Sequence, residues 1–133
     1  MDARDFLLIA DRFRASPCEA ERRTSVGRSY YAVFNVVLGA LAAKGVAFHE
    51  SADDHRDLIA YLAKVGHRDA GYIGQVLNDL RTQRNSADYK MNAVVSMKTS
   101  EFVYKKAKGA IETFDAIPSG DLNEIARKIQ AIP

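Results

Sequence analysis

The chain is short of the residues that would cross-link its fold or interrupt its helices. A single cysteine, Cys18, excludes an internal disulfide and favours a reducing compartment. The three prolines, Pro17, Pro118 and Pro133, each stand where a helix is expected to begin or end. Strand-like alternation of apolar and polar residues never persists beyond a few positions. These absences favour a protein built from helices alone.

A strong charge of one sign and a long apolar run are missing too. The 19 Lys and Arg residues are nearly balanced by 17 Asp and Glu, which excludes a strongly basic coat for nucleic acid and leaves only a local patch. The longest nearly uncharged stretch, residues 29–43, is too short and polar to span a membrane. The first ten residues lack the apolar run of a secretory signal. We expect a cytoplasmic protein without membrane contact.

The apolar periodicity predicts an all-α, single-domain, up-and-down bundle of about five to six helices over residues 1–133. The core covers about residues 20–117, and an accessory helix follows at about 121–132. Ser16 and Pro17 are predicted to cap and open the second helix, and Gly45 to end it. The six helices are expected at residues 2–15, 17–44, 53–65, 69–88, 96–117 and 121–132.

The second helix is apolar over more than one stripe. One stripe joins residues 26, 30, 33, 37 and 41, and its neighbour joins 31, 34, 38 and 41. A helix of this kind is central and contacts other helices, or a second subunit, on two sides. Arg28 and Asn35 are its polar exceptions, with Tyr31 between them. One interpretation is that Arg28 and Asn35 donate hydrogen bonds to neighbouring helices.

The fourth helix ends in a polar cluster. Arg81, Arg84 and Asp88 stand at positions i, i+3 and i+7, so they share one side of the helix beside Asn85 and Tyr89. Guanidinium groups suit bidentate contacts with phosphate, so the cluster is a candidate phosphate site. The structural alternative is an intrahelical pair of Arg84 with Asp88, while the ring of Tyr89 covers the core.

No histidine lies within or after this cluster. His49, His55 and His67 are scattered over loops and helix ends, where we expect surface or capping roles. Their spacing is not that of metal ligands, and no glycine-rich phosphate loop is present. The sequence therefore predicts no metal site and no cofactor.

Two segments together resemble the HEPN family (higher eukaryotes and prokaryotes nucleotide-binding domain). They are Arg-Ser-Tyr-Tyr-Ala-Val-Phe-Asn at 28–35 and Leu-Arg-Thr-Gln-Arg-Asn-Ser-Ala-Asp-Tyr at 80–89. The resemblance covers about residues 20–114. It implies a helical bundle that dimerises around its central helices. The implied binding residues are Arg81, Arg84, Asn85, Asp88, Tyr89, Arg28, Tyr31 and Asn35.

Many HEPN proteins are metal-independent ribonucleases, and often toxins, with an arginine followed four to six residues later by histidine. Arg84 and Asn85 match the start of that motif, but the histidine position falls on Tyr89, Lys90 or Met91. Tyrosine, with an ordinary pKa near 10, is a poor base at neutral pH. Asp88 beside Arg84 would stay ionised. The resemblance therefore supports binding better than cleavage.

Three functions follow from this comparison. The first is a non-catalytic, homodimeric HEPN-like module of a toxin–antitoxin or defence-type system, which binds a nucleotide, RNA or a protein partner. The resemblance adds a nucleotidyltransferase as a candidate partner, with Tyr89 as a candidate acceptor of its modification. The second is a divergent ribonuclease toxin that uses Arg84, Asp88 and Tyr89. The third is a structural scaffold subunit, in which both motifs only pack at a dimer interface.

Overall fold

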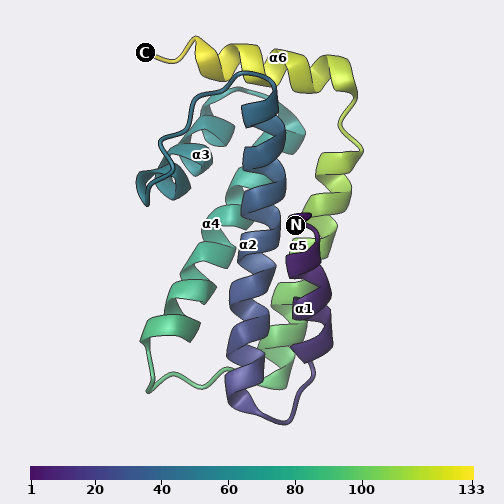
Figure 1. The fold of residues 1–133 in the computed structure, drawn as a ribbon, viewed down its shortest axis with the longest axis vertical. Helices are drawn as coiled ribbons and strands as arrows, with labels where there is room; N and C mark the ends of the chain where they lie inside the picture. Colours follow the sequence, from purple (N-terminus) through teal and green to yellow (C-terminus); the bar gives the residue numbers. More distant parts are fainter.

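Six helices and no strand make up the computed structural model, which describes residues 1–133. In Figure 1, α1, α2, α4 and α5 run along the long axis in alternating directions, α3 packs beside α4, and α6 crosses one end. The predicted all-α bundle is confirmed, although α6 lies across it rather than along it. The helices are α1 (Asp5–Phe13), α2 (Glu19–Ala43), α3 (Asp53–Lys64), α4 (Arg68–Tyr89), α5 (Met97–Asp115) and α6 (Ser119–Gln130).

Helix α2 is the centre of the bundle and packs against α1, α4 and α5 (Figure 1). Its predicted inner stripe is at most 1% exposed at every position. Full burial of a large apolar side chain contributes about 1.5–3 kcal/mol, so this stripe is a major source of stability. Small residues allow the close contact with α1, where Ser25 Oγ donates a hydrogen bond of 2.7 Å to the Ala10 carbonyl. The stripe consists of Val26, Tyr30, Val33, Val37 and Leu41.

By length and composition alone, α2 could also cross a membrane. Half of its most apolar stretch is buried against the other helices of the bundle. Central helices of soluble proteins pass the same test, so this property is weak evidence for a membrane span.

Helix α3 is brought against α4 by a glycine. A Cβ atom on Gly74 would lie 3.1 Å from Leu62 Cβ, so the close contact of these helices depends on the missing side chain. At the far end of the bundle, α6 adds Ile125, Ala126 and Ile129 to the same buried cluster as the other helices. The helix expected to be accessory therefore shares the main core.

The start of α2 corrects one prediction. Ser16 and Pro17 precede the helix, which begins at Glu19 after an extended Cys18. The Ser16 hydroxyl instead accepts the Cys18 N–H at 3.0 Å and lies 2.5 Å from a Glu21 oxygen, so it shapes the preceding turn. At the other end, Gly45 has φ +95°, and the predicted left-handed ending is confirmed.

The connection between α4 and α5 is held by the first two turns of α2. The Arg23 guanidinium donates to the carbonyls of Ala87 (2.7 Å), Lys90 (3.2 Å) and Ala93. Val95 makes two further hydrogen bonds to α2. Its carbonyl accepts from Arg22 Nε (2.8 Å), and its N–H donates to a Glu19 oxygen (3.1 Å). The Val95 N–H and the nearby arginines lower the pKa of Glu19. These contacts set where α4 ends.

Replacement of Arg23 tests this anchor. We expect Arg23→Ala to lower the free energy of unfolding by about 2–3 kcal/mol, because it leaves three carbonyls without their charged donor. Urea unfolding followed by circular dichroism measures the change. Arg12→Ala is the matched control, because Arg12 is exposed on α1. Equal stability of the two variants would contradict the anchoring role.

Candidate functional site

The two motif segments meet where Arg84 of α4 contacts Tyr31 of α2. Arg84 Nη2 donates a 2.7 Å hydrogen bond to the Tyr31 hydroxyl, across 53 residues of sequence. The guanidinium lies 5.2 Å from the centre of the Tyr31 ring and 5.7 Å from that of Tyr89. This geometry is typical of cation–π contacts. Arg84 therefore links two aromatic rings from two helices.

The remaining contacts of Arg84 come from its own helix. Nη1 donates to Asn85 Oδ1 at 3.0 Å, and Nε lies 3.0 Å from Asp88 Oδ2. The Nε–H does not point at that oxygen, so Arg84 and Asp88 form an ion pair without this hydrogen bond. The predicted intrahelical pair is confirmed. The suggestion that Tyr89 covers the core is wrong, because its side chain is on the last turn of α4 and 70% exposed.

Arg81 differs from Arg84 in having no partner. It is half-buried on α4, one turn before Arg84, and forms no hydrogen bond or ion pair. Burial lowers the pKa of His55 and raises that of Tyr30, and the charge of Arg81 adds to the first shift and opposes the second. A half-buried cation without a counter-charge is a natural site for an anion.

Arg28 and Asn35 do not make the contacts expected of them. The Arg28 guanidinium stacks over Phe6 of α1, 5.4 Å from the ring centre, and donates no hydrogen bond. Asn35 Nδ2 donates to the Tyr31 carbonyl of its own helix at 2.8 Å. The prediction that these side chains donate hydrogen bonds to neighbouring helices is therefore wrong. Arg28 packs on an aromatic ring of α1, and Asn35 donates to the backbone of its own helix. Phe6 also lies 6.3 Å from the Tyr31 ring, which connects Arg28 to the Arg84 cluster.

His55 of α3 is a site residue that sequence reasoning missed. Its ring is half-buried and stacks on Phe34 with centres 4.1 Å apart, and its Nδ1 lies 2.5 Å from the Tyr30 hydroxyl. The surface or capping role expected for His55 is therefore wrong. The packing of α3 on α4 brings the first turn of α3, which carries His55, into contact with α2. One signal was available: His55, Leu58 and Leu62 share the apolar face of α3 at i, i+3 and i+7.

The protonation states of His55 and Tyr30 follow from burial and charge. Burial raises the pKa of Tyr30 to about 12, so its hydroxyl keeps its proton. Burial, and then the charges of Arg81 and Arg84, lower the pKa of His55, so its imidazole is neutral at pH 7. The fully buried Tyr30 hydroxyl has only Nδ1 as an acceptor. The hydrogen-bond pattern therefore assigns the remaining imidazole proton to Nε2.

The other two histidines have the roles that their positions predict. His49 is exposed in the connection before α3. His67 caps α4, because its Nδ1 accepts the Ala70 N–H at 3.3 Å while its Nε2 lies 3.1 Å from an Asp121 oxygen. No group of three or more His, Cys, Asp or Glu side chains could hold a metal ion.

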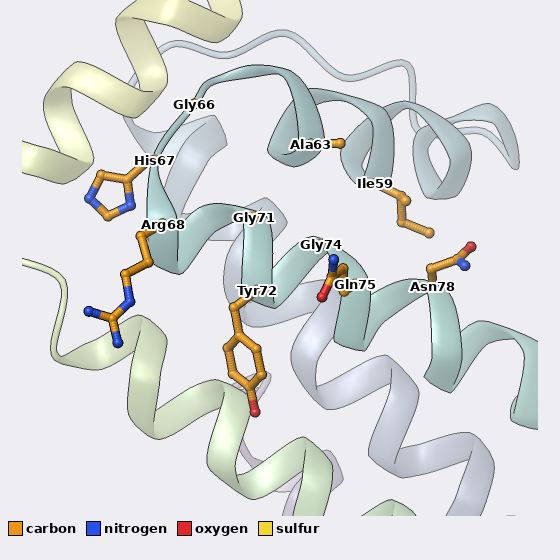
Figure 2. Close-up of a pocket in the computed structure, with 10 residues that line it drawn as sticks. All are labelled: Ile59, Ala63, Gly66, His67, Arg68, Gly71, Tyr72, Gly74, Gln75 and Asn78. Carbon is orange, nitrogen blue, oxygen red and sulfur yellow. The ribbon is translucent and has the colours of Figure 1, made fainter.

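Two surface hollows lie near α3. The first, of about 640 Å³, lies along α3 and α4 and is shown in Figure 2. Its longest side chains, Arg68 and Tyr72, extend away from α3 and do not converge with Asn78 or Ile59 on a common point (Figure 2). None of the predicted site residues lines it. The second, of about 510 Å³, is lined by His55 and Asn35 and adjoins the Arg84 cluster through His55.

The chain matches no protein-family model, no curated protein and no solved structure. The HEPN resemblance therefore rests on the two motif segments alone, and membership of that family stays a prediction.

The lowered pKa of His55 makes stability depend on pH. Below its ordinary pKa of about 6.5, the unfolded chain takes up a proton that the folded His55 resists, so the free energy of unfolding falls as the pH falls. We expect this loss between pH 6.5 and 5 to be smaller in His55→Gln, which does not titrate. Urea unfolding at a series of pH values measures both slopes. Parallel slopes in the two proteins would refute the assigned environment of His55.

Proposed function

We propose that the protein is a non-catalytic module that binds the phosphate of a nucleotide or RNA through Arg81 and Arg84. The observation that carries this proposal is the unpaired, half-buried guanidinium of Arg81. In the folded chain alone, that charge is partly desolvated and has no compensating acceptor, an arrangement that a phosphate oxygen would complete.

The surroundings of the arginines also support a nucleic-acid ligand. The Tyr89 ring is exposed beside Arg84, so its free face is available to a base. Stacking on aromatic rings next to arginines is the usual way in which proteins hold unpaired bases. A purely structural subunit would have little reason to leave Arg81 without a partner and the Tyr89 ring largely exposed.

The ribonuclease alternative needs a group that accepts the proton of the attacking hydroxyl. His55 is the histidine whose pKa responds to both arginines, but Tyr30 occupies its Nδ1 and its Nε2 already carries a proton. Asp88 is ion-paired with Arg84. The site therefore offers donors and cations rather than a base, which favours binding over cleavage.

The homodimer and the paired nucleotidyltransferase follow from the resemblance and belong to the same proposal. The outer side of α2 around Tyr31 and Leu38 stays partly exposed in the single chain, which leaves room for a second copy there. A monomeric mass in light scattering at high protein concentration would rule out that assembly.

Removal of the unpaired charge is the direct test of binding. We expect Arg81→Ala to weaken binding of single-stranded RNA at least tenfold and to lower its salt dependence, because a phosphate contact is lost. The free energy of unfolding should change by no more than about 0.5 kcal/mol, since Arg81 holds no partner in the fold. Fluorescence anisotropy of a labelled RNA and urea unfolding measure the two effects.

Arg68→Ala is the matched control for this test. Arg68 is exposed, lies on the same helix about 20 Å from Arg81, and lines the hollow of Figure 2. Its loss should leave RNA binding unchanged. If Arg68→Ala abolishes binding while Arg81→Ala does not, the ligand occupies the hollow between α3 and α4 instead.

The absence of a base predicts no cleavage. Purified protein at high concentration should leave RNA intact over hours, as gel electrophoresis of a labelled strand would show. Cleavage that disappears in Arg84→Ala and persists in Arg68→Ala would establish the ribonuclease function instead.

A further inference from the structure

A cleft beside His55 lies between the second half of α2, the connection at residues 46–51 and the first turn of α3. Its volume is about 510 Å³, which is enough for a nucleobase and part of a sugar. The apolar wall includes Phe34, Leu38 and Phe48, and polar groups come from Asn35, Glu50 and His55. Apolar walls with a few polar groups are the usual composition of a small-molecule site.

His55 connects this cleft to the arginines. Its ring lies edge-on to Tyr31, with centres 6.0 Å apart, and the Tyr31 hydroxyl accepts from Arg84. Arg81 and Arg84 both act electrostatically on the imidazole. Because Tyr30 occupies Nδ1, the Nε2–H of His55 is its one polar group available to a ligand. Arg84 is therefore joined to the cleft through Tyr31 and His55.

The two ends of this combined site carry opposite charge. Arg84 contacts Tyr31, the neighbour of His55, and Arg81 lies one turn before Arg84 on α4, whereas Glu50 and Asp54 line the cleft. The Asp54 carboxylate is buried and accepts the N–H groups of His49 (2.9 Å) and Ser51 (3.3 Å), so it shapes the connection. A phosphate inside the cleft would meet these carboxylates, so the anionic end of a ligand belongs on the arginines.

Glu50 is held in an unusual conformation at the mouth of the cleft. Its φ is +54°, a left-handed conformation that residues with a side chain rarely adopt. The connection keeps this conformation because Asp54 binds the backbone on both sides of Glu50. The backbone of Glu50 is thereby fixed beside the apolar wall, and its exposed, acidic side chain lines the cleft.

We propose that the cleft binds the base of a nucleotide whose phosphate lies on Arg81 and Arg84, and that this base is guanine. The inference rests on the proposed function and identifies the ligand of that site. Guanine presents a ring N–H and an amino group that suit the Glu50 carboxylate, and its O6 and N7 accept from a donor such as His55 Nε2–H. Uracil lacks the amino group, so it satisfies the carboxylate less well.

Filling the cleft tests the proposal without touching the arginines or His55. Ala42 is exposed on α2 and lines the cleft, so Ala42→Phe places a ring inside it and leaves the core intact. Calorimetric titration uses guanosine 5′-monophosphate, uridine 5′-monophosphate and ribose 5-phosphate. We expect the guanosine nucleotide to bind about tenfold more tightly than the other two, and Ala42→Phe to remove that advantage. Ala43→Phe is the control, because Ala43 is exposed but lies outside the cleft.

The same titrations separate failure of this inference from failure of the proposed function. The base site is overturned, and the phosphate site stands, under one combination of results. All three compounds bind with equal affinity, that affinity falls in Arg81→Ala, and it is unchanged in Ala42→Phe. If neither these compounds nor RNA binds, the proposed function itself fails. Single-stranded oligonucleotides of guanosine and of uridine form the second arm. A preference for guanosine in the oligonucleotides alone would identify RNA, rather than the free nucleotide, as the source of the base.

Discussion

Burial of α2 on most of its circumference is the constraint on which the rest of the structure depends. Because α1, α4 and α5 cover its apolar stripe, Tyr30 is fully enclosed and Tyr31, one position along, reaches the edge of α4. The hydrogen bond between Tyr31 and Arg84 is possible only in that arrangement. The candidate site is thus a consequence of how the central helix is packed.

Four of the arginines on α2 and α4 fall into two groups according to how their charge is compensated. Arg22 and Arg23 donate to backbone carbonyls and hold the connection after α4, and Arg84 is shared between a hydroxyl, an amide and a carboxylate. Arg81 has none of these partners. The first group explains the fold, and the uncompensated charge indicates where an anion would bind.

Much of the helical architecture could be predicted, because the positions of apolar side chains along one helix are a local property of the chain. The inner stripe of α2 and the pairing of Arg84 with Asp88 follow from spacing alone. The start of α2 and the contact of Arg28 could not be predicted in this way. Both depend on contacts with residues far away in the sequence, such as the ring of Phe6 on α1, which Arg28 packs against.

The sequence by itself determined six helices, a central α2 and an arginine-rich end of α4. Only the tertiary structure decided that His55 joins this site, that its Nδ1 faces Tyr30, and that a cleft opens beside it. The physical reason is that helix periodicity fixes which residues share a face, while the crossing of two helices depends on how closely they approach. Here the missing side chain of Gly74 allows α3 to pack on α4, next to the Tyr30 and Phe34 rings that hold His55.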